Sequence, residues 1–427
     1  MELEISKEET DYMYKLVEKI IEEVGPRMPC SPQEAEGAKI IKTELEQTCD
    51  DVVVESFTCH PKAFLGWIKM IIIMSFFSML FYLFMQWVSD ILLIAFSLIS
   101  FLLIFLSFLI MWEEFFNYNE FIDAIFRKRK SQNVIGKFRG KEEQKKIIIF
   151  SSHIDSALQF NLLKMLGWGF IPLAFIGILL MLTWLILSFI NLIVIIMGFI
   201  SLKGIFLWTT YWLLIIGTPC FLGLFFFVPL GDKGNVVPGA VDNLSSCVVI
   251  VGLGRYINKH KEIIPKNTEI RLISFGCEES GLRGSRRYIS AHLEELKKND
   301  TIVVNMDGLE TPDMFHVIEY EPTTRTRHSE EVIQKLLKAA ELVGIKANRL
   351  GAGKLEKTLG RLSGGSDAAV FSKANIKAAF LNSADWKRRS SYYHQDTDTP
   401  DKIRGGTLEN ALKICITFLL NEKKYPE

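Results

Sequence analysis

Four long apolar runs stand out in the pattern of hydrophobic and polar positions along the chain. Each approaches or exceeds the ~20 helical residues that cross the ~30 Å hydrocarbon core of a bilayer, so each predicts a transmembrane helix. A buried helix of a soluble core is the alternative interpretation, but soluble domains rarely contain about 20 uncharged residues in succession. The runs span residues 70–88, 91–112, 166–190 and 204–230.

The four runs are grouped as two helical hairpins, at residues 63–112 and 166–230. We expect the first hairpin to turn at Ser89 and Asp90 and the second to turn near Lys203. The uncharged stretch 191–202 is more than a second span requires, so it either extends a helix or lies at the membrane interface.

Outside the hairpins, short β-rich runs alternate with helical periodicity. An apolar helical repeat over 13–24 stops at Gly25, and a second helix opens at Ser31, where Glu34 is placed to complete a capping box. The alternation predicts an α/β fold, with a mostly parallel central sheet and helices on both faces. The predicted strands are 52–57, 133–138, 147–150, 270–275, 302–305 and 378–381, and the later helices are 245–256, 282–296, 330–342 and 407–420.

Residues 1–62, 113–165 and 231–427 are expected to form one domain that the hairpins interrupt. Strands on both sides of each insertion can join one sheet only if the insertion crosses the membrane an even number of times. Two crossings for each hairpin satisfy this condition.

Charge changes this picture in two ways. The chain balances 49 Lys and Arg against 49 Asp and Glu, so its overall charge does not support a polyanion-binding or strongly acidic character, and nucleic acid is an unexpected partner. The hairpin regions contain only three charged residues, which are Lys69, Asp90 and Lys203. The protein is therefore predicted to be neither purely soluble nor purely membrane-embedded.

Loop charges predict the orientation in the membrane. No apolar stretch near the start resembles a signal peptide, and the only basic residue at the hairpin tips is Lys203. The positive-inside rule therefore places the soluble domain and both termini in the cytoplasm. Seven cysteines without disulfide or zinc-finger spacing fit a reducing compartment. The basic residues on the domain side are Lys62, Lys69, Arg127, Lys128, Arg129, Lys130, Lys164 and Lys233.

Acidic and imidazole side chains follow several of the predicted strands. Ligand crevices of open α/β sheets lie beyond the carboxyl ends of the strands. Taken alone, each of these side chains is more often a helix cap or a solvated polar group than a ligand. Together they are harder to explain in that way, because buried carboxylates are costly unless they are paired or bind metal. The set is His153, Asp155, Asp242, Glu278, Glu279, Asp307 and His394.

The motifs SSHIDS, GAVDNLSS, FGCEESGLRGS, NMDG and YHQDTDTPDKI resemble, in this order, the signature of the co-catalytic di-zinc aminopeptidases, metallopeptidase family twenty-eight. The resemblance implies two zinc ions bridged by Asp242. His153 and Asp307 would complete one site, and Glu279 and His394 the other. It also implies that Glu278 is the general base, that Asp155 orients His153, and that Asp398 matches a further acidic position of the pattern.

Elementary chemistry agrees with these implied roles. Two cations ~3.5 to 4 Å apart can share a carboxylate and a hydroxide, which lowers the pKa of water and polarises the scissile carbonyl. A neighbouring Glu that is not a ligand can take the water proton and pass it to the leaving amine. The donor that stabilises the tetrahedral oxyanion stays open between the backbone of 364–366 and the hydroxyls of Tyr392 and Tyr393.

These observations predict a membrane-anchored, zinc-dependent aminopeptidase whose partners are a peptide substrate and the lipid bilayer; they set no oligomeric state. One alternative is a glutaminyl-peptide cyclase-like enzyme with a single zinc ion. The other is a non-catalytic membrane scaffold that retains the peptidase fold. The complete set of five ligand-type residues, together with Glu278, favours hydrolysis over both.

Overall fold

The computed structural model describes residues 3–88, 90–199, 203–230, 236–351, 353, 360 and 363–424. The expected turn residue Ser89, the stretch 200–202 before Lys203, and Lys233 lie outside the described residues. The chain folds into two compact units. The first, called the sheet unit, comprises Met1–Pro61, Arg127–Gln159 and Gly231–Glu427, and the second, called the helical unit, comprises Lys62–Phe126 and Phe160–Leu230.

The helical unit extends beyond the apolar hairpins themselves. Residues 113–126, which we expected to belong to the soluble domain, pack with the apolar helices instead. The ring of Phe115 lies 5.7 Å from that of Trp67, and the ring of Phe126 covers Gly66 so closely that a Cβ there would meet it at 2.7 Å. Aromatic contacts therefore hold this segment in the helical unit.

The sheet unit is built on a mixed sheet that has eight strands in the described part of the chain. The strand order is β1-β2-β4-β3-β5-β10-β6-β9. The central pairings β4-β3, β3-β5 and β5-β10 are parallel, and so is β6-β9, whereas the pairings β1-β2, β2-β4 and β10-β6 are antiparallel. The strands are β1 (Asp51–Cys59), β2 (Arg129–Arg139), β3 (Lys146–His153), β4 (Thr268–Phe275), β5 (Asp300–Leu309), β6 (Phe315–Ile318), β9 (Ala347–Leu350) and β10 (Lys377–Ser383).

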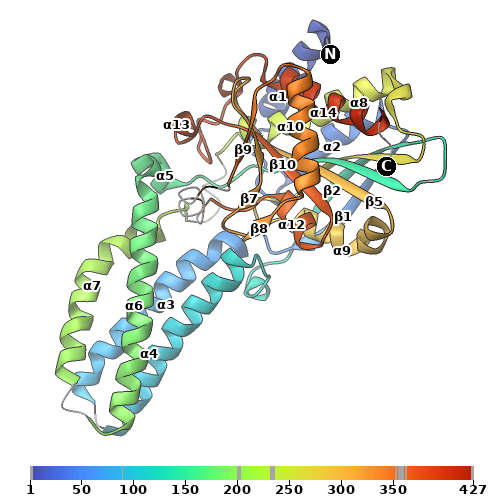
Figure 1. Cartoon of the computed structure of the whole chain (residues 1–427). Helices are drawn as coiled ribbons and strands as arrows, with labels where there is room; N and C mark the ends of the chain where they lie inside the picture. Colours follow the sequence, from blue (N-terminus) through green and yellow to red (C-terminus); the bar gives the residue numbers. More distant parts are fainter. Residues whose placement is uncertain are drawn as a thin grey trace. The chain divides into compact units, whose positions relative to one another are not determined.

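Helices cover both faces of this sheet, as Figure 1 shows. Along β3 the side chains alternate: Ile148 and Phe150 join the core under α1, α2, α8, α10 and α14, while Ile147 and Ile149 join the core under α9 and α12. A strand buried on both faces reads as a continuous apolar run, which is why IIIF marks this position in the sequence. The α/β class with helices on both faces is confirmed. The helices are α1 (Lys7–Glu23), α2 (Pro32–Glu46), α8 (Ser245–Lys259), α9 (Arg283–Lys298), α10 (Glu330–Leu342), α12 (Asp367–Lys373) and α14 (Thr407–Lys424).

The start of α2 differs from the expected capping box. The Ser31 hydroxyl accepts the Glu34 backbone N–H at 3.0 Å, as a cap should. The Glu34 carboxylate does not return to Ser31; it accepts hydrogen bonds from the backbone N–H groups of Cys30 and Cys277 and from the Ser131 hydroxyl. Glu34 is fully buried, so long-range backbone donors replace the local one.

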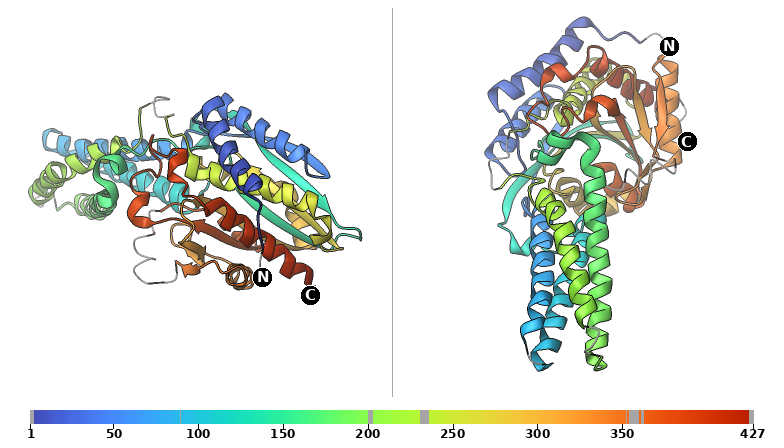
Figure 2. Two further views of the ribbon diagram at one scale, coloured as in Figure 1. Left: turned by 90° about the horizontal axis from the view of Figure 1, so that it is seen from above. Right: turned by 90° about the vertical axis from the view of Figure 1, so that its left-hand side faces the viewer.

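In the described part of the helical unit four long helices are present, and they form a bundle (Figures 1 and 2). Within it α3 packs on α4 and α7, and α6 packs on α4 and α7. Hydrogen bonds between neutral side chains connect the helices: Tyr82 donates to Asn191 at 2.8 Å, and Trp184 donates to the Ser78 hydroxyl at 2.7 Å. Such bonds suit an apolar environment because they leave no polar group unpaired. The helices are α3 (Ala63–Phe84), α4 (Asp90–Met111), α6 (Phe170–Ile196) and α7 (Lys203–Phe225).

Five described helical stretches have the length and composition of membrane spans. Four belong to the helical unit, with only 22% to 33% of each apolar window buried. The fifth, Ala240–Lys259, is 89% buried and contains α8 in the core of the sheet unit. A helix that is apolar on all sides and enclosed by its own domain is a core helix. The uncharged stretch after residue 190 continues α6 as far as Ile196.

Candidate metal centre

The ligand-type side chains converge at the carboxyl ends of the central parallel strands. His153 is the last residue of β3, and Asp307 lies near the end of β5. The parallel register pairs Ser151 with Asn305, which places His153 and Asp307 two residues further along adjacent strands. This edge is where an open α/β sheet holds its ligands.

The other candidates arrive on turns. Glu278 and Glu279 follow β4, and Asp242 lies in the turn Ala240–Leu244 that leads into α8. His394 follows the short helix α13 (Trp386–Arg389) and adopts a left-handed conformation with φ of 51°. Such a conformation is uncommon for a residue other than glycine and is found preferentially at functional sites.

Asp242 lies between the two imidazoles. Its Oδ1 is 3.4 Å from His153 Nε2, and its Oδ2 is 3.2 Å from His394 Nε2. His394 Nε2 is also 3.4 Å from Glu279 Oε1, and His153 Nε2 is 3.8 Å from Asp307 Oδ2. The structure therefore brings together all five residues predicted as ligands.

The donor set fits a pair of divalent cations. One ligand atom from each of His153, Asp242 and Asp307 can lie within 4.8 Å of the others, and the same holds for Asp242, Glu279 and His394. Asp242 is common to both groups. Among the described residues, Nε2 of His153 has no hydrogen-bond partner although the side chain is buried. Imidazole nitrogens and carboxylate oxygens are zinc ligands, and a cation would compensate the cost of burying them together.

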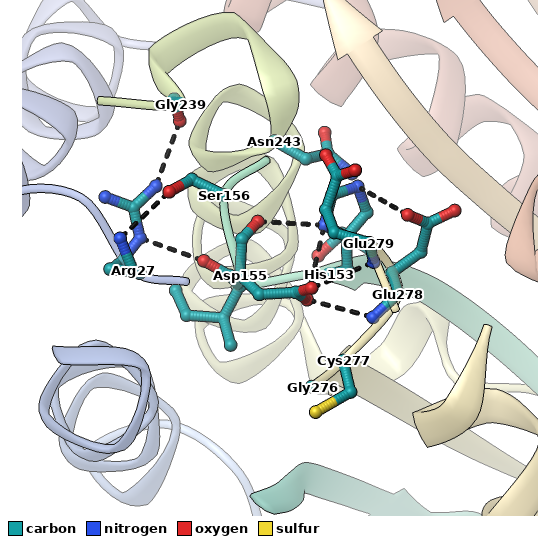
Figure 3. A network of polar contacts seen from close by, with 12 residues as sticks. Arg27, His153, Asp155, Ser156, Gly239, Asn243, Gly276, Cys277, Glu278 and Glu279 are labelled. Carbon is teal, nitrogen blue, oxygen red and sulfur yellow. Dashed lines mark hydrogen bonds and ion pairs between the residues drawn. The ribbon is translucent and has the colours of Figure 1, made fainter. Parts of the chain in front are cut away.

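Asp155 organises the surroundings of these side chains (Figure 3). Its two carboxylate oxygens accept the backbone N–H groups of Glu278 at 3.1 Å and of Glu279 at 2.9 Å. Nδ1 of His153 lies 3.1 Å from the Asp155 carbonyl oxygen and 3.5 Å from its carboxylate. A proton on Nδ1 leaves Nε2 unprotonated toward the cluster, the tautomer that a metal ligand requires.

Arg27 is a buried residue that connects several backbone segments near the cluster, and the sequence pattern did not identify it. Its guanidinium donates to the carbonyl oxygens of Ile154, Gly25, Pro238 and Gly239 at 2.8 to 3.1 Å, and Figure 3 shows the contact with Gly239. These carbonyls belong to three separate stretches of the chain. One side chain thus fixes the end of β3 relative to the loop that leads to Asp242.

The environment sets the charge of the cluster. Burial raises the pKa of both Glu278 and Glu279 well above the ordinary value. Burial also opposes the ionisation of Asp242, but the imidazoles of His153 and His394, 3.4 and 3.2 Å from its two oxygens, outweigh this effect and lower the pKa of the carboxyl. Asp398 accepts the backbone N–H groups of Val241 and Asp242, and burial followed by the charge of Asp242 raises its pKa to about 8.

Comparison with known proteins finds similarity to a peptidase family. Residues 228–419 match the model described as Peptidase family M28. This part of the chain is thus similar in sequence to peptidase family M28. Aminopeptidase YwaD of Bacillus subtilis (strain 168) is 28% identical over 182 residues, which cover 42% of this chain and 37% of that protein. The alignment thus spans little more than a third of this relative.

Several solved structures share the fold of this chain over almost its whole length. BSAP, a zinc aminopeptidase from Bacillus subtilis, has a TM-score of 0.54 at 16% identity, over 99% of this chain and 96% of that one. LapA aminopeptidase from Legionella pneumophila has a TM-score of 0.52 at 13% identity, covering 100% and 77%. A glutaminyl cyclase from an Acidobacteriales bacterium has a TM-score of 0.54 at 13% identity, covering 99% and 98%.

The candidates for the donor that stabilises the oxyanion differ in the contacts that they already make. The backbone N–H of Ser366 donates to Glu321, and the Tyr392 hydroxyl donates to Glu310, so both are already engaged. Tyr393 stacks on His394 with ring centroids 4.0 Å apart, and the Arg389 guanidinium lies 4.1 Å from the Tyr393 ring. Part of the segment LGRLSGGSDAAVF, residues 359, 361 and 362, lies outside the described residues.

Asp367 is an acidic neighbour that we did not single out from the sequence. It is 1% exposed at the start of α12, and burial raises its pKa to about 7, with His153 opposing the shift. The charge of Asp367 in turn contributes to the raised pKa of Glu278. Only the fold places this residue beside the cluster, because in sequence it resembles an ordinary helix-start aspartate.

Proposed function

We propose that the protein is a membrane-anchored metallo-aminopeptidase that removes N-terminal residues from peptides. The observation that carries the proposal is Asp242, whose two oxygens face His153 and His394 within one cluster of ligand-type side chains. The match of residues 228–419 to the M28 family model supports a peptide substrate, and the fold likeness to a zinc aminopeptidase supports zinc as the metal.

In this proposal Asp242 would be a ligand of two zinc ions. His153 and Asp307 would hold one ion, and Glu279 and His394 would hold the other. When bound, zinc supplies Lewis-acid activation of water and of the scissile carbonyl. Asp307 and Glu279 are half-buried, whereas His153, Asp242 and His394 are buried, so the cluster keeps one accessible side for a substrate.

Glu278 is the proposed general base. Its carboxylate takes a proton from the attacking water and passes it to the leaving amine, so the group is unchanged after each turnover. Burial and neighbouring acids raise its pKa, and a base whose pKa lies closer to neutrality also donates the proton efficiently in the second step. Asp155 holds the backbone of Glu278 and Glu279 and is therefore a positioning residue.

Substitution Glu278→Gln tests the proposal, because it retains the shape of the side chain and removes the base. We expect kcat to fall by about 10²- to 10⁴-fold in an assay with aminoacyl reporter amides. The zinc content measured by mass spectrometry should not change. The matched control is Glu36→Gln on the exposed face of α2, which should leave kcat unaltered. Full turnover in the Glu278→Gln variant would refute the assigned role.

Metal stoichiometry separates the two enzymatic interpretations. The fold likeness to a glutaminyl cyclase gives the single-zinc alternative a structural precedent. Two zinc ions per chain with release of an N-terminal amino acid support the aminopeptidase. One tightly held ion with cyclisation of N-terminal glutamine supports the cyclase, and zinc binding without any turnover supports the scaffold.

We further propose that α3, α4, α6 and α7 span the membrane and that the sheet unit and both termini face the cytoplasm. Exposed apolar side chains along these helices support a lipid environment, since Phe77, Leu102 and Ile186 are 48%, 49% and 51% exposed. A reporter fused after residue 427 should be protected from protease in sealed right-side-out vesicles, whereas a tag inserted at residue 200 should be cleaved. The reverse pattern would refute the orientation.

A further inference from the structure

A second cluster of ligand-type side chains lies in the sheet unit apart from the five proposed zinc ligands. It consists of the thiols of Cys30, Cys59 and Cys277, and we call it the thiol cluster. The three sulfurs are in mutual contact, at 3.4 Å for Cys30 to Cys59, 3.4 Å for Cys30 to Cys277 and 3.5 Å for Cys59 to Cys277. All three side chains are buried, with Cys59 and Cys277 at 0% exposure.

The three cysteines come from distant parts of the chain. Cys30 precedes α2, Cys59 ends β1, and Cys277 follows β4 directly before Glu278. A buried cysteine usually behaves as a small apolar side chain and packs against hydrocarbon. Here the three sulfurs pack mainly on each other, and the only apolar neighbour grouped with them is the half-buried Phe57 among the described residues.

The backbone is bent to present two of these thiols. Cys30 has φ of 59° and Cys277 has φ of 56°, both in the left-handed region that residues other than glycine rarely adopt. One buried carboxylate holds both bends, since Glu34 accepts the N–H of Cys30 at 2.8 Å and the N–H of Cys277 at 2.9 Å. Strained residues that are held in place by their surroundings are found preferentially at functional sites.

We propose that the thiol cluster binds a thiophilic cation such as Zn²⁺, Cd²⁺ or Cu⁺ through three thiolates. The centre of the sulfur triangle is about 2.0 Å from each sulfur, against about 2.3 Å for a zinc–thiolate bond, so outward shifts of about 0.3 Å admit the ion. Binding releases the thiol protons to solvent and requires no oxidant or reductant. Soft thiolates select such cations over the harder Mg²⁺ and Ca²⁺.

A disulfide explains the arrangement less well. A disulfide joins two sulfurs at about 2.05 Å and would leave the third thiol unexplained. The ion would instead engage all three sulfurs and connect the segment before α2, the end of β1 and the loop after β4. The last of these carries Glu278 and Glu279, so the cation would serve as a structural clamp next to the proposed active site.

The test uses the full-length protein, saturated with zinc, in detergent micelles. Cd²⁺, the softer cation, displaces zinc at the thiolates in preference to the nitrogen and oxygen ligands. Titration with Cd²⁺ should produce ultraviolet thiolate-to-cadmium charge-transfer absorption that saturates at one ion per chain. Cys59→Ser should weaken this binding about tenfold or more, since it removes one ligand and leaves the loop of Glu278 unaltered. The matched control is Cys49→Ser, a half-buried cysteine of the same unit outside the cluster, which should titrate like the wild type.

A second measurement keeps the proposal testable if Cys59→Ser does not fold. X-ray absorption at the cadmium edge of the wild-type protein with one bound Cd²⁺ should show three sulfur neighbours. Absence of thiolate absorption, a coordination shell of oxygen and nitrogen, or equal titrations of the wild type and Cys59→Ser would each overturn the proposal. None of these results depends on peptidase activity, so the thiol cluster and the proposed function can fail independently.

Discussion

The contacts between the long helices and the strand ends of the sheet unit bury polar side chains in different ways. Neutral side chains form hydrogen bonds between the long helices, as in the bond from Tyr82 to Asn191. At the strand ends of the sheet unit, ionisable groups converge with their charges facing one another, as His153 and Asp242 do. Neutral pairs are stable in an apolar interior on their own, whereas converging carboxylates require a cation. The contrast separates polar groups that hold helices together from polar groups that are arranged for chemistry.

The largest effect on activity is expected from a substitution at the carboxylate between the two imidazoles. Asp242→Asn takes away the negative charge between the two imidazoles, so we expect loss of bound zinc and a fall in kcat/KM of at least about 10³-fold. Zinc content and turnover of the purified protein measure this. Asp313→Asn, on an exposed surface, is the control. Retention of two zinc ions by Asp242→Asn would contradict the shared-ligand arrangement.

The converse change puts an unpaired carboxylate into the helical unit. Asn191→Asp places a charge between α3 and α6 with no cation to compensate it. A charge at the centre of a membrane helix typically costs about 2.5 to 3.5 kcal/mol, and because Asn191 lies near the end of α6 the cost here should be smaller than that. Unfolding in mixed micelles should show a loss below this range. Asn191→Leu, which removes the hydrogen bond without adding charge, should cost much less. Equal costs for the two variants would show that charge is not what this interior excludes.

Asp155→Asn changes how the cluster is held and leaves the five proposed ligands intact. The Asp155 carboxylate accepts two backbone N–H groups, one on each oxygen. The amide of Asn has a single oxygen and can replace only one of these acceptors. Partners that support metal ligands typically contribute about 10- to 100-fold in metal affinity, and we expect a loss in that range. Competition with a zinc-binding dye measures it. Unchanged affinity together with unchanged kcat would rule out a positioning role.

The stability of the metal-free protein should depend on pH because of the buried acids near the cluster. Burial raises the pKa of Asp367 to about 7, above its value in the unfolded chain, so the folded state binds this proton more tightly. The contribution to stability is therefore present at low pH and is lost as the pH rises from about 4 to about 7. Melting temperatures of the metal-free protein should fall over this range, and less steeply in Asp367→Asn. Parallel curves for the two proteins would contradict the shift.

The smallest effect belongs to a single neutral pair in the helical unit. Tyr82→Phe removes the hydroxyl that donates to Asn191 and should destabilise the bundle by about 0.6 kcal/mol, the average for hydrogen bonds between membrane helices. Tyr211→Phe on the exposed side of α7 is the control and should have no effect. A loss as large as that of Asn191→Asp would remove the distinction drawn between the two units.

Local pattern was sufficient for much of this structure. The apolar run at β3 and the helical repeat of α1 are properties of neighbouring residues. β3 contains the predicted range 147–150, and α1 contains the predicted repeat as far as Glu23, one residue short of its expected end. The polar residues just after the strands were visible for the same reason, since parallel strands deliver their ends to one edge of the sheet. The antiparallel edge strand β1, paired with β2, and the added strands β6 and β9 depend on partners distant in sequence and were not assigned a direction or were not predicted.

The sequence by itself determined which residues are apolar enough to form long helices and which strands end in acids and imidazoles. Tertiary structure alone decided that Glu34 holds the bends at Cys30 and Cys277, that Arg27 ties three stretches of chain together, and that Asp367 lies beside the cluster. The physical reason is the distance along the sequence over which each kind of interaction acts. Periodicity and capping act within a few residues, whereas hydrogen bonds and charges in a buried interior act between any groups that the fold brings into contact.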